Sequence, residues 1–320
     1  MTARAYNNEF RERDSGFWVS TALLKIRVAL LTAAMLCVAM LSSCETTPRA
    51  DSGGGAGGGT GEVDAPSYET IAARHNDRLD RMTAVYAVGS VDLRWTDDDG
   101  KHFETVHAKM WFVLPDRTAM DVGKMGERQM WLGSNGSVTW MVDFSNDETV
   151  LYLYDASRDA DREPAVRPPI QPHTLVKLFG LGRLPVGLPG PSPAATYDSQ
   201  RQAWVVTVHE AKQVVRLYFD PDSLLPIRVE LLSPDLVVLM HSTLSLGRYE
   251  RVQVAGTVPG SQPRFPTLVD IVHADGSGSV KVAVRNPTDA VKEKYFELDW
   301  IKSAFDPDRI EGRLGPLPAP

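Results

Sequence analysis

The sequence predicts a mainly β protein in which one antiparallel sheet of about 11–12 strands is accompanied by two or three helices. From residue 85 onward, apolar and polar residues alternate with the period of two that is typical of a strand. Turn residues such as Asn135-Gly136 and Asp220-Pro221 separate these runs. Helical patterns of about 10–15 residues do not intervene between the runs, which argues against a parallel βαβ sheet.

The first predicted element is a helix over residues 67–82, with Ser67 as its N-cap. Tyr68, Ile71 and Leu79 fall on one helical face, and charged residues fall opposite them. A short second helix is predicted to begin at Pro172, which suits the first helical position.

The predicted strands form two groups of six around that short helix. The first group spans 85–95, 103–114, 117–122, 127–133, 138–143 and 149–154. The second group spans 203–208, 213–219, 225–232, 236–246, 265–273 and 279–285. Residues 180–191 between the groups are apolar but rich in Gly and Pro, so they predict a loop packed over the core or a mobile lid.

The N-terminal region has the pattern of an export signal. Lys25 and Arg27 precede an apolar run of 14 residues, 28–41, whereas a membrane span needs about 20. Leu41-Ser42-Ser43-Cys44 resembles a bacterial lipobox, which implies that residues 1–43 are removed and that Cys44 carries the lipid. A soluble-secretion signal with an incidental cysteine and an uncleaved anchor are the alternatives.

Composition limits what the processed chain does. Residues 1–43 hold five basic and three acidic residues, so the remaining chain has a net charge of −9 against −7 for the whole sequence. A net acidic domain is poorly suited to nucleic acid or to anionic lipid, which leaves covalent lipid as the link to a membrane. The other cysteine, Cys37, lies in the signal, so no thiol remains for a disulfide, a metal or a nucleophile.

Residues 44–66 follow as a Gly-rich linker that is predicted to be flexible, with a root-mean-square reach of about 25 Å. The predicted domain covers 67–305, and residues 306–320 form a Pro-rich tail.

The order of elements resembles the Lol-type superfamily of outer-membrane lipoprotein carriers and receptors. The resemblance rests on Tyr218-Phe219-Asp220-Pro221 followed by Leu224-Leu225-Pro226-Ile227-Arg228, and on the close from Asn286-Pro287 to Tyr295-Phe296-Glu297-Leu298. It implies a half-open β-barrel, a strongly curved sheet whose hollow is plugged by helices. In that superfamily the hollow holds the acyl chains of lipoproteins.

A lipid-holding hollow needs a continuous apolar wall, and unbranched methionines suit an irregular one. The candidate cavity residues are Leu93, Trp95, Met110, Phe112, Met120, Met130, Trp140 and Leu151. The candidate lid residues are Leu178, Phe179, Leu181 and Leu184. The same residues also suit a solid core beneath the first helix, and the sequence leaves both interpretations open.

Catalysis has little support, because the chain lacks a Gly-x-Ser-x-Gly elbow and a His-Glu-x-x-His motif. The sequence therefore predicts no enzyme, no metal and no cofactor. The first hypothesis is a lipid-anchored, periplasm-facing lipoprotein that binds lipid or acylated lipoprotein in its hollow, with the outer membrane favoured over the inner. The alternative is a structural or sensor lipoprotein with a filled hollow that acts through protein contacts.

Overall fold

The structure is a computed structural model that describes residues 65–97, 99–155, 171–187, 193–258 and 260–312. The predicted signal at 1–43, the predicted lipid attachment site Cys44 and the Gly-rich stretch at 52–61 lie outside the described residues, as do residues 313–320 of the predicted tail.

Helix α2 (Tyr68–Asp80) is the predicted first helix, and Ser67 caps it as predicted. The hydroxyl of Ser67 accepts a hydrogen bond from the backbone N–H of Thr70 at 3.2 Å, which satisfies one of the donors that a helix start leaves without a partner. Ile71 and Leu79 are fully buried on the apolar face. The helix is therefore fixed to the core along its length.

Two runs of strands follow, on either side of the short helix α3 (Pro172–Leu178), which begins at the predicted proline. The first run is β1 (Ala84–Asp97), β2 (Gly100–Val113), β3 (Arg117–Lys124), β4 (Glu127–Asn135), β5 (Val138–Asp143) and β6 (Val150–Asp155). The second run is β7 (Ala195–Asp198), β8 (Ala203–His209), β9 (Val214–Phe219), β10 (Pro226–Leu232), β11 (Val238–Leu244), β12 (Tyr249–Arg251), β13 (Arg264–Pro266), β14 (Leu268–His273) and β15 (Gly278–Thr288). The chain continues through η3 (Glu293–Phe296), α4 (Leu298–Phe305) and β16 (Arg309–Glu311), and the turn η2 (Leu246–Arg248) precedes β12.

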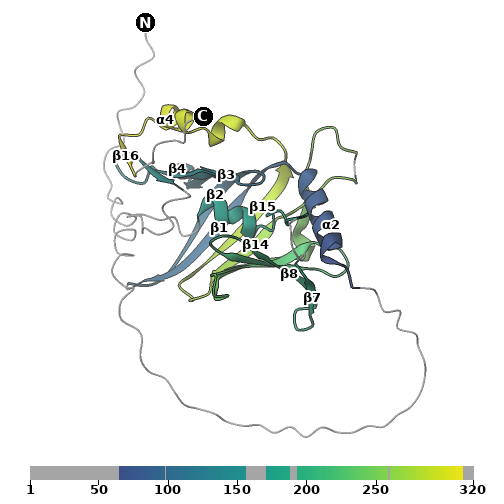
Figure 1. Ribbon diagram of the computed structural model, residues 1–320. Helices are drawn as coiled ribbons and strands as arrows, with labels where there is room; N and C mark the ends of the chain where they lie inside the picture. The colour runs from purple at the N-terminus through teal and green to yellow at the C-terminus, as the bar shows by residue number, and fades with distance from the viewer. Residues whose placement is uncertain (1–64, 98, 156–170, 188–192, 259, 313–320) are drawn as a thin grey trace, which may run out of the picture.

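Fourteen of these strands form one sheet in the order β16-β6-β5-β4-β3-β2-β1-β15-β14-β11-β10-β9-β8-β7. Neighbours pair antiparallel except β16, which pairs parallel with β6. Strands β16 and β7 end the order and do not pair with each other, so the sheet stays open. The predicted half-open, antiparallel fold is confirmed, and Figure 1 shows the sheet curving from β3 and β4 at the top to β8 and β7 below.

The structure differs from the prediction in three strands and one break. Strands β7, β12 and β16 were not predicted, and β16 lies beyond the predicted domain end at 305. The predicted strand 265–273 is two strands, β13 and β14, which belong to different sheets. Thr267 separates them because its hydroxyl and its backbone N–H both bond to the carbonyl of Arg248, each at 2.7 Å.

Apolar side chains cover both faces of the sheet. The inner cluster combines α2, α3 and residues 178–184 with strands from both halves of the sheet, so it occupies the hollow. Its largest fully buried members include Ile71, Leu79, Met82, Met110, Phe112, Leu178, Phe179, Leu181, Phe219 and Phe265. The outer cluster on the opposite face is Trp111, Val113, Ala119, Trp131, Val138, Trp140, Val142, Leu151, Leu153, Phe296 and Ile301.

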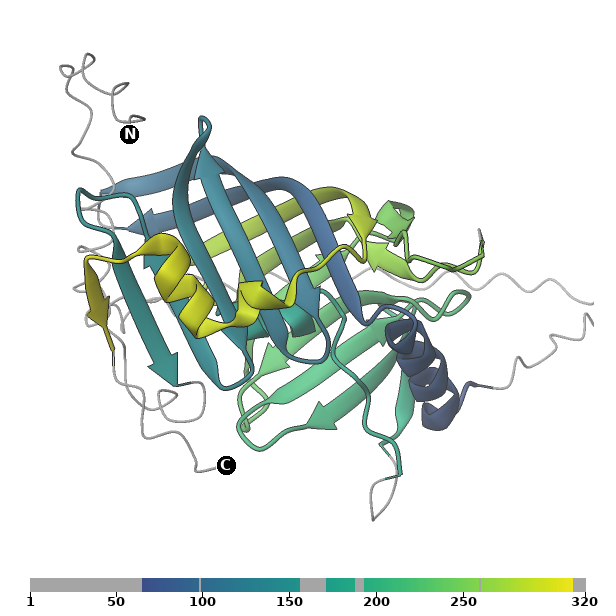
Figure 2. The same ribbon diagram turned by 90° about the horizontal axis from the view of Figure 1, so that it is seen from above.

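Helix α4 lies on the outer face, so two of the predicted two or three helices, α2 and α3, pack in the hollow. It crosses the strands on the side away from β7 and β8 (Figures 1 and 2). Phe296 of η3 and Ile301 of α4 are 3% and 0% exposed and belong to the outer cluster. An ion pair of 2.5 Å between Arg117 and Glu293 and the pairing of β16 with β6 hold the two ends of this segment.

Candidate functional site

The structure divides the predicted cavity residues between the two faces. Met110 and Phe112 belong to the inner cluster, and Leu93 and Met120 pack against it. Trp140 and Leu151 belong to the outer cluster. Trp95 and Met130 are half-buried and lie in neither cluster, and Trp95 stacks on His102 with ring centroids 5.1 Å apart.

Large buried side chains pack together inside the hollow. Phe179 of the predicted lid packs against Phe112 and Phe265, with ring centroids 5.1 and 5.6 Å apart, and all three rings are at most 1% exposed. A small pocket beside Lys177 and Leu217 has a volume of about 20 Å³, enough for about one water molecule. An acyl chain needs far more space than this pocket provides.

The predicted lid residues are core residues. Leu178, Phe179 and Leu181 are fully buried and Leu184 is 2% exposed. The loop interpretation, in which the segment packs over the core, therefore describes residues 180–187 better than a mobile lid does.

Helix α2 holds the segment 180–185 through its polar side chains. His75 Nε2 lies 2.8 Å from the carbonyl oxygen of Gly182, and Arg78 donates to the carbonyl of Gly180 at 2.6 Å. Asn76 makes two bonds to the backbone of Leu184, at 2.8 and 3.0 Å. These bonds satisfy backbone groups that burial would otherwise leave without a partner, so they fix the segment in place.

Burial shifts the pKa values of two of the α2 side chains that hold the segment 180–185, His75 and Arg78. Burial, followed by the nearby charge of Arg78, lowers the pKa of His75 to about 3. His75 is therefore neutral and donates to Gly182 without carrying a charge into the core. Burial also lowers the pKa of Arg78, an effect that Tyr249 opposes.

A second site lies on the outer face, where a pocket of about 520 Å³ opens between β1–β4 and the η3–α4 segment. This volume is within the range of small-molecule sites. Its aromatic walls are Tyr86, Trp111, Trp131, Tyr295, Trp300 and Phe305. We call it the outer pocket.

The strand alternation places these rings. Trp111 and Trp131 point to the outer face because their neighbours Met110 and Met130 point to the other side of the same strands. Tyr295 lies 4.9 Å from Trp111 between ring centroids, and Phe305 lies 5.3 Å from Trp131. The rings of η3 and α4 thus complete a wall that the sheet begins.

Basic residues surround the outer pocket. Lys109, Arg128, Lys292 and Lys294 line it together with one acid, Asp121. Arg128 donates to both oxygens of Asp121, at 2.8 and 3.0 Å, and this pairing raises the pKa of the guanidinium. The same guanidinium lies 5.2 Å from the ring centroid of Phe305, within the range of a cation–π contact.

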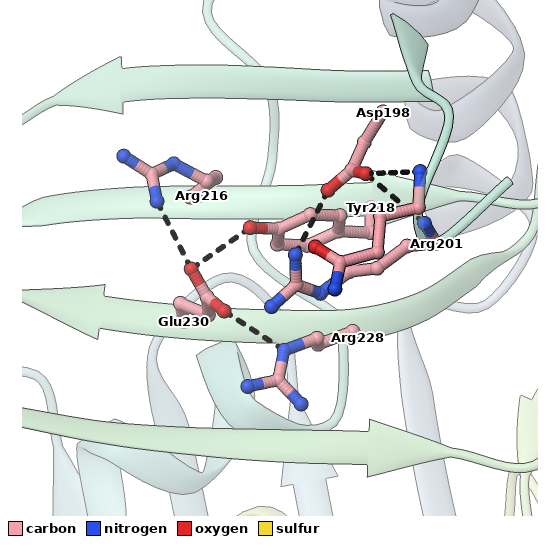
Figure 3. A network of polar contacts seen from close by, with 7 residues as sticks. Asp198, Arg201, Arg216, Tyr218, Arg228 and Glu230 are labelled. Atoms are coloured by element: carbon pink, nitrogen blue, oxygen red, sulfur yellow. Dashed lines mark hydrogen bonds and ion pairs between the residues drawn. The ribbon is translucent and has the colours of Figure 1, made fainter. Parts of the chain in front are cut away.

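A charged cluster occupies the outer face of β8–β10, away from this pocket. Glu230, 3% exposed, accepts hydrogen bonds from Arg216, Tyr218 and Arg228 at 3.1, 2.9 and 2.8 Å (Figure 3). Burial raises the pKa of Glu230, but the bonds from Arg228 and Tyr218 outweigh burial and the pKa lies below its usual value. The carboxylate is satisfied by its neighbours, which indicates a structural role.

Among the described residues, no three His, Cys, Asp or Glu side chains are grouped so as to hold a metal ion. No helix in the described ranges is both long and apolar enough to cross a membrane.

Sequence reasoning missed the outer pocket. One signal was present, because β4 and β5 carry Trp131 and Trp140 at positions where an uncovered outer face would carry polar residues. Apolar residues on both faces of a strand predict that both faces are covered. The segment that covers the outer face lies more than 150 residues away in the chain.

No family model matches the chain, and no curated protein matches it in sequence. Among solved structures it is similar to a LolA superfamily protein from Nitrosomonas europaea, with 13% identity and a TM-score of 0.47, over 74% of this chain and 100% of that one. It is also similar to a domain assigned to outer-membrane lipoprotein sorting from Vibrio parahaemolyticus, with 9% identity and a TM-score of 0.49, over 72% and 97% of the two chains. At these identities the likeness concerns the fold alone.

Proposed function

We propose that this protein is a lipid-anchored, non-catalytic lipoprotein of the cell envelope whose hollow is a solid core and which acts through contacts on its outer surface. The observation that supports the proposal is the inner cluster, in which buried side chains of α2, α3 and residues 178–184 pack where an acyl chain would lie. The alternative with a filled hollow is thus the better of the two hypotheses.

The anchor is part of the proposal. The lipobox-like Leu41-Ser42-Ser43-Cys44 supports lipid attachment at Cys44, and the linker that follows allows the domain to reorient above the membrane surface. We place the protein at the periplasmic side of the outer membrane in preference to the inner membrane.

The lipid-carrier function keeps one specific observation in its favour. Met110, Met120, Met130 and Met141 line neighbouring strands, and methionine adapts to irregular ligands. A carrier would have to move α3 and residues 178–185 out of the hollow. That movement would break the bonds from His75, Asn76 and Arg78.

A neutral acyl probe separates the two functions, because a chain is held in an apolar hollow at about 0.8 kcal/mol per buried CH₂ without any charged anchor. The processed chain with Cys44→Ala would be titrated with a fluorescent long-chain acylglycerol. We expect no saturable binding. Saturable binding of one probe per chain, displaced by unlabelled acylglycerol, would overturn the solid core and restore the carrier.

A further inference from the structure

The outer pocket presents charge of one sign to a ligand. Its lining has four basic residues and one acid, a local net charge of +3, on a chain whose net charge is −7. The acid, Asp121, is already paired with Arg128, and Lys109 lies 3.8 Å from one of its oxygens. The ion pairs between described residues include neither Lys292 nor Lys294.

Aromatic walls often bind cations, but in this pocket cations of the chain itself already lie over one face of three of the rings. Arg128 lies over Trp131 and Phe305, and the amino group of Lys294 lies 4.9 Å from the ring centroid of Trp300. A cationic ligand would add like charge to a site that has no unpaired acid among its lining residues. Charge complementarity therefore selects an anion.

The rings supply the other half of the recognition. Trp111 and Trp131 are 6% and 2% exposed and form the floor, whereas Tyr295, Trp300 and Phe305 are half-buried at the side of η3 and α4. Half-buried rings next to exposed lysines offer an apolar surface and a charged rim within one pocket. A ligand that contacts both the rings and the lysines needs an apolar body as well as an anionic group.

We propose that the outer pocket binds a small anionic amphiphile, with its carboxylate or phosphate at Lys292 and Lys294 and its apolar body against Trp300 and Phe305. This site goes beyond the proposed function, since neither the anchor nor the solid core requires it. A carboxylate and a phosphate are both anionic groups that accept hydrogen bonds from lysine. The experiment below distinguishes a carboxylate amphiphile from a phosphate amphiphile.

The test uses the processed chain with Cys44→Ala and calorimetric titration below the critical micelle concentration of each probe. The probes are laurate, monododecyl phosphate, the neutral dodecyl maltoside and inorganic phosphate. We expect saturable binding of one anionic amphiphile per chain, at least tenfold tighter than either dodecyl maltoside or inorganic phosphate. Whichever of laurate and monododecyl phosphate binds more tightly identifies the preferred head group.

One double variant and one control variant locate the site. Lys292→Ser with Lys294→Ser should weaken binding of the anionic amphiphile at least tenfold, and added salt should weaken binding to the unchanged protein. Lys281→Ser is the matched control, because this exposed lysine lies on the same face in β15, outside the pocket, and should leave binding unchanged. All variants should melt within a few degrees of the parent, since the three lysines are exposed.

The proposal is overturned if the anionic and neutral amphiphiles bind equally, if the double variant binds as the parent does, or if Lys281→Ser loses as much affinity. These outcomes leave the solid hollow untouched. Saturable binding of the neutral acylglycerol would contradict the solid hollow and leave the anion site standing.

Discussion

Replacing Phe179 by Ala tests whether residues 178–184 are part of a solid core or a movable lid. The side chain is fully buried, and its ring packs on Phe112 and Phe265. A Phe→Ala change in a core costs about 3–5 kcal/mol of folding free energy. The loss of two aromatic pairs, each about 0.5–1.5 kcal/mol, places the expectation in the upper part of that range.

The assay is urea unfolding followed by far-UV circular dichroism and tryptophan fluorescence, with a thermal melt beside it. For a domain of this size the melting temperature should fall by about 6–20 °C. Val186→Ala is the matched control, because Val186 lies in the same segment but is 63% exposed, and it should stay within about 0.5 kcal/mol of the parent. If Phe179→Ala costs less than about 1 kcal/mol, the segment is a weakly held lid and the solid core is wrong.

Four further changes test other parts of the molecule. Burial holds the pKa of His75 near 3, below its ordinary 6.5, so its contribution to folding stability is complete above pH 6.5 and falls by about 1.4 kcal/mol per pH unit toward pH 3. His75→Gln should therefore reduce the pH dependence of the urea midpoint between pH 6.5 and pH 3, and an unchanged pH dependence would contradict the assignment. Because the pKa of Glu230 is lowered, its contribution is present above its usual 4.5 and is lost progressively as the pH falls below that value. Glu230→Gln should therefore cost about 1.5–3 kcal/mol at pH 7 and less at pH 3, and an equal cost at both would exclude a charge effect. A Cβ on Gly133 would lie 2.5 Å from the carbonyl oxygen of Thr118 and 2.6 Å from the ring of Trp140, so Gly133→Ala should cost about 1–3 kcal/mol in denaturant unfolding. A neutral result would mean that both the strand backbone and the ring shift freely. Cys44→Ala should release the protein from membranes, and protein that stays in the pellet after a carbonate wash would indicate an uncleaved anchor.

Local chemistry made much of the fold predictable. The Ser67 cap, the start of α3 at Pro172 and the turn at Asn135-Gly136 depend on neighbouring residues, so the sequence displays them directly. The two-residue period identified most of the long strands because each buries alternate side chains. Short strands such as β7 and β16 have three or four residues, too few to show a period.

The candidate site was less predictable because it depends on contacts between distant parts of the chain. The alternation around Met110 and Trp111 shows that they face opposite sides, but it does not show which side is the hollow. Trp140 and Leu151 were therefore assigned to the cavity although they lie beneath α4. Helix α4 itself has only eight residues, and Ile301 is its one fully buried residue.

The predicted lid shows a different limit. Leu178 to Leu184 are apolar and contain glycines, a composition that suits a buried segment as well as a mobile one. The structure decides between them through His75, Asn76 and Arg78, whose partners are backbone carbonyls and amides. Such partners leave no trace in the residue types of the segment they hold.

Native-state hydrogen exchange at the amides of Phe179 and Leu181 tests the solid hollow most directly. These amides donate to Leu175 and Val176 at 2.9 and 3.0 Å within the α3 segment. If the segment is core, they exchange only through global unfolding, and their exchange free energy falls with denaturant as steeply as that of the central strands β1 and β15. Fast exchange that is insensitive to denaturant, while β1 and β15 stay protected, would show that the segment opens locally and that the hollow is accessible.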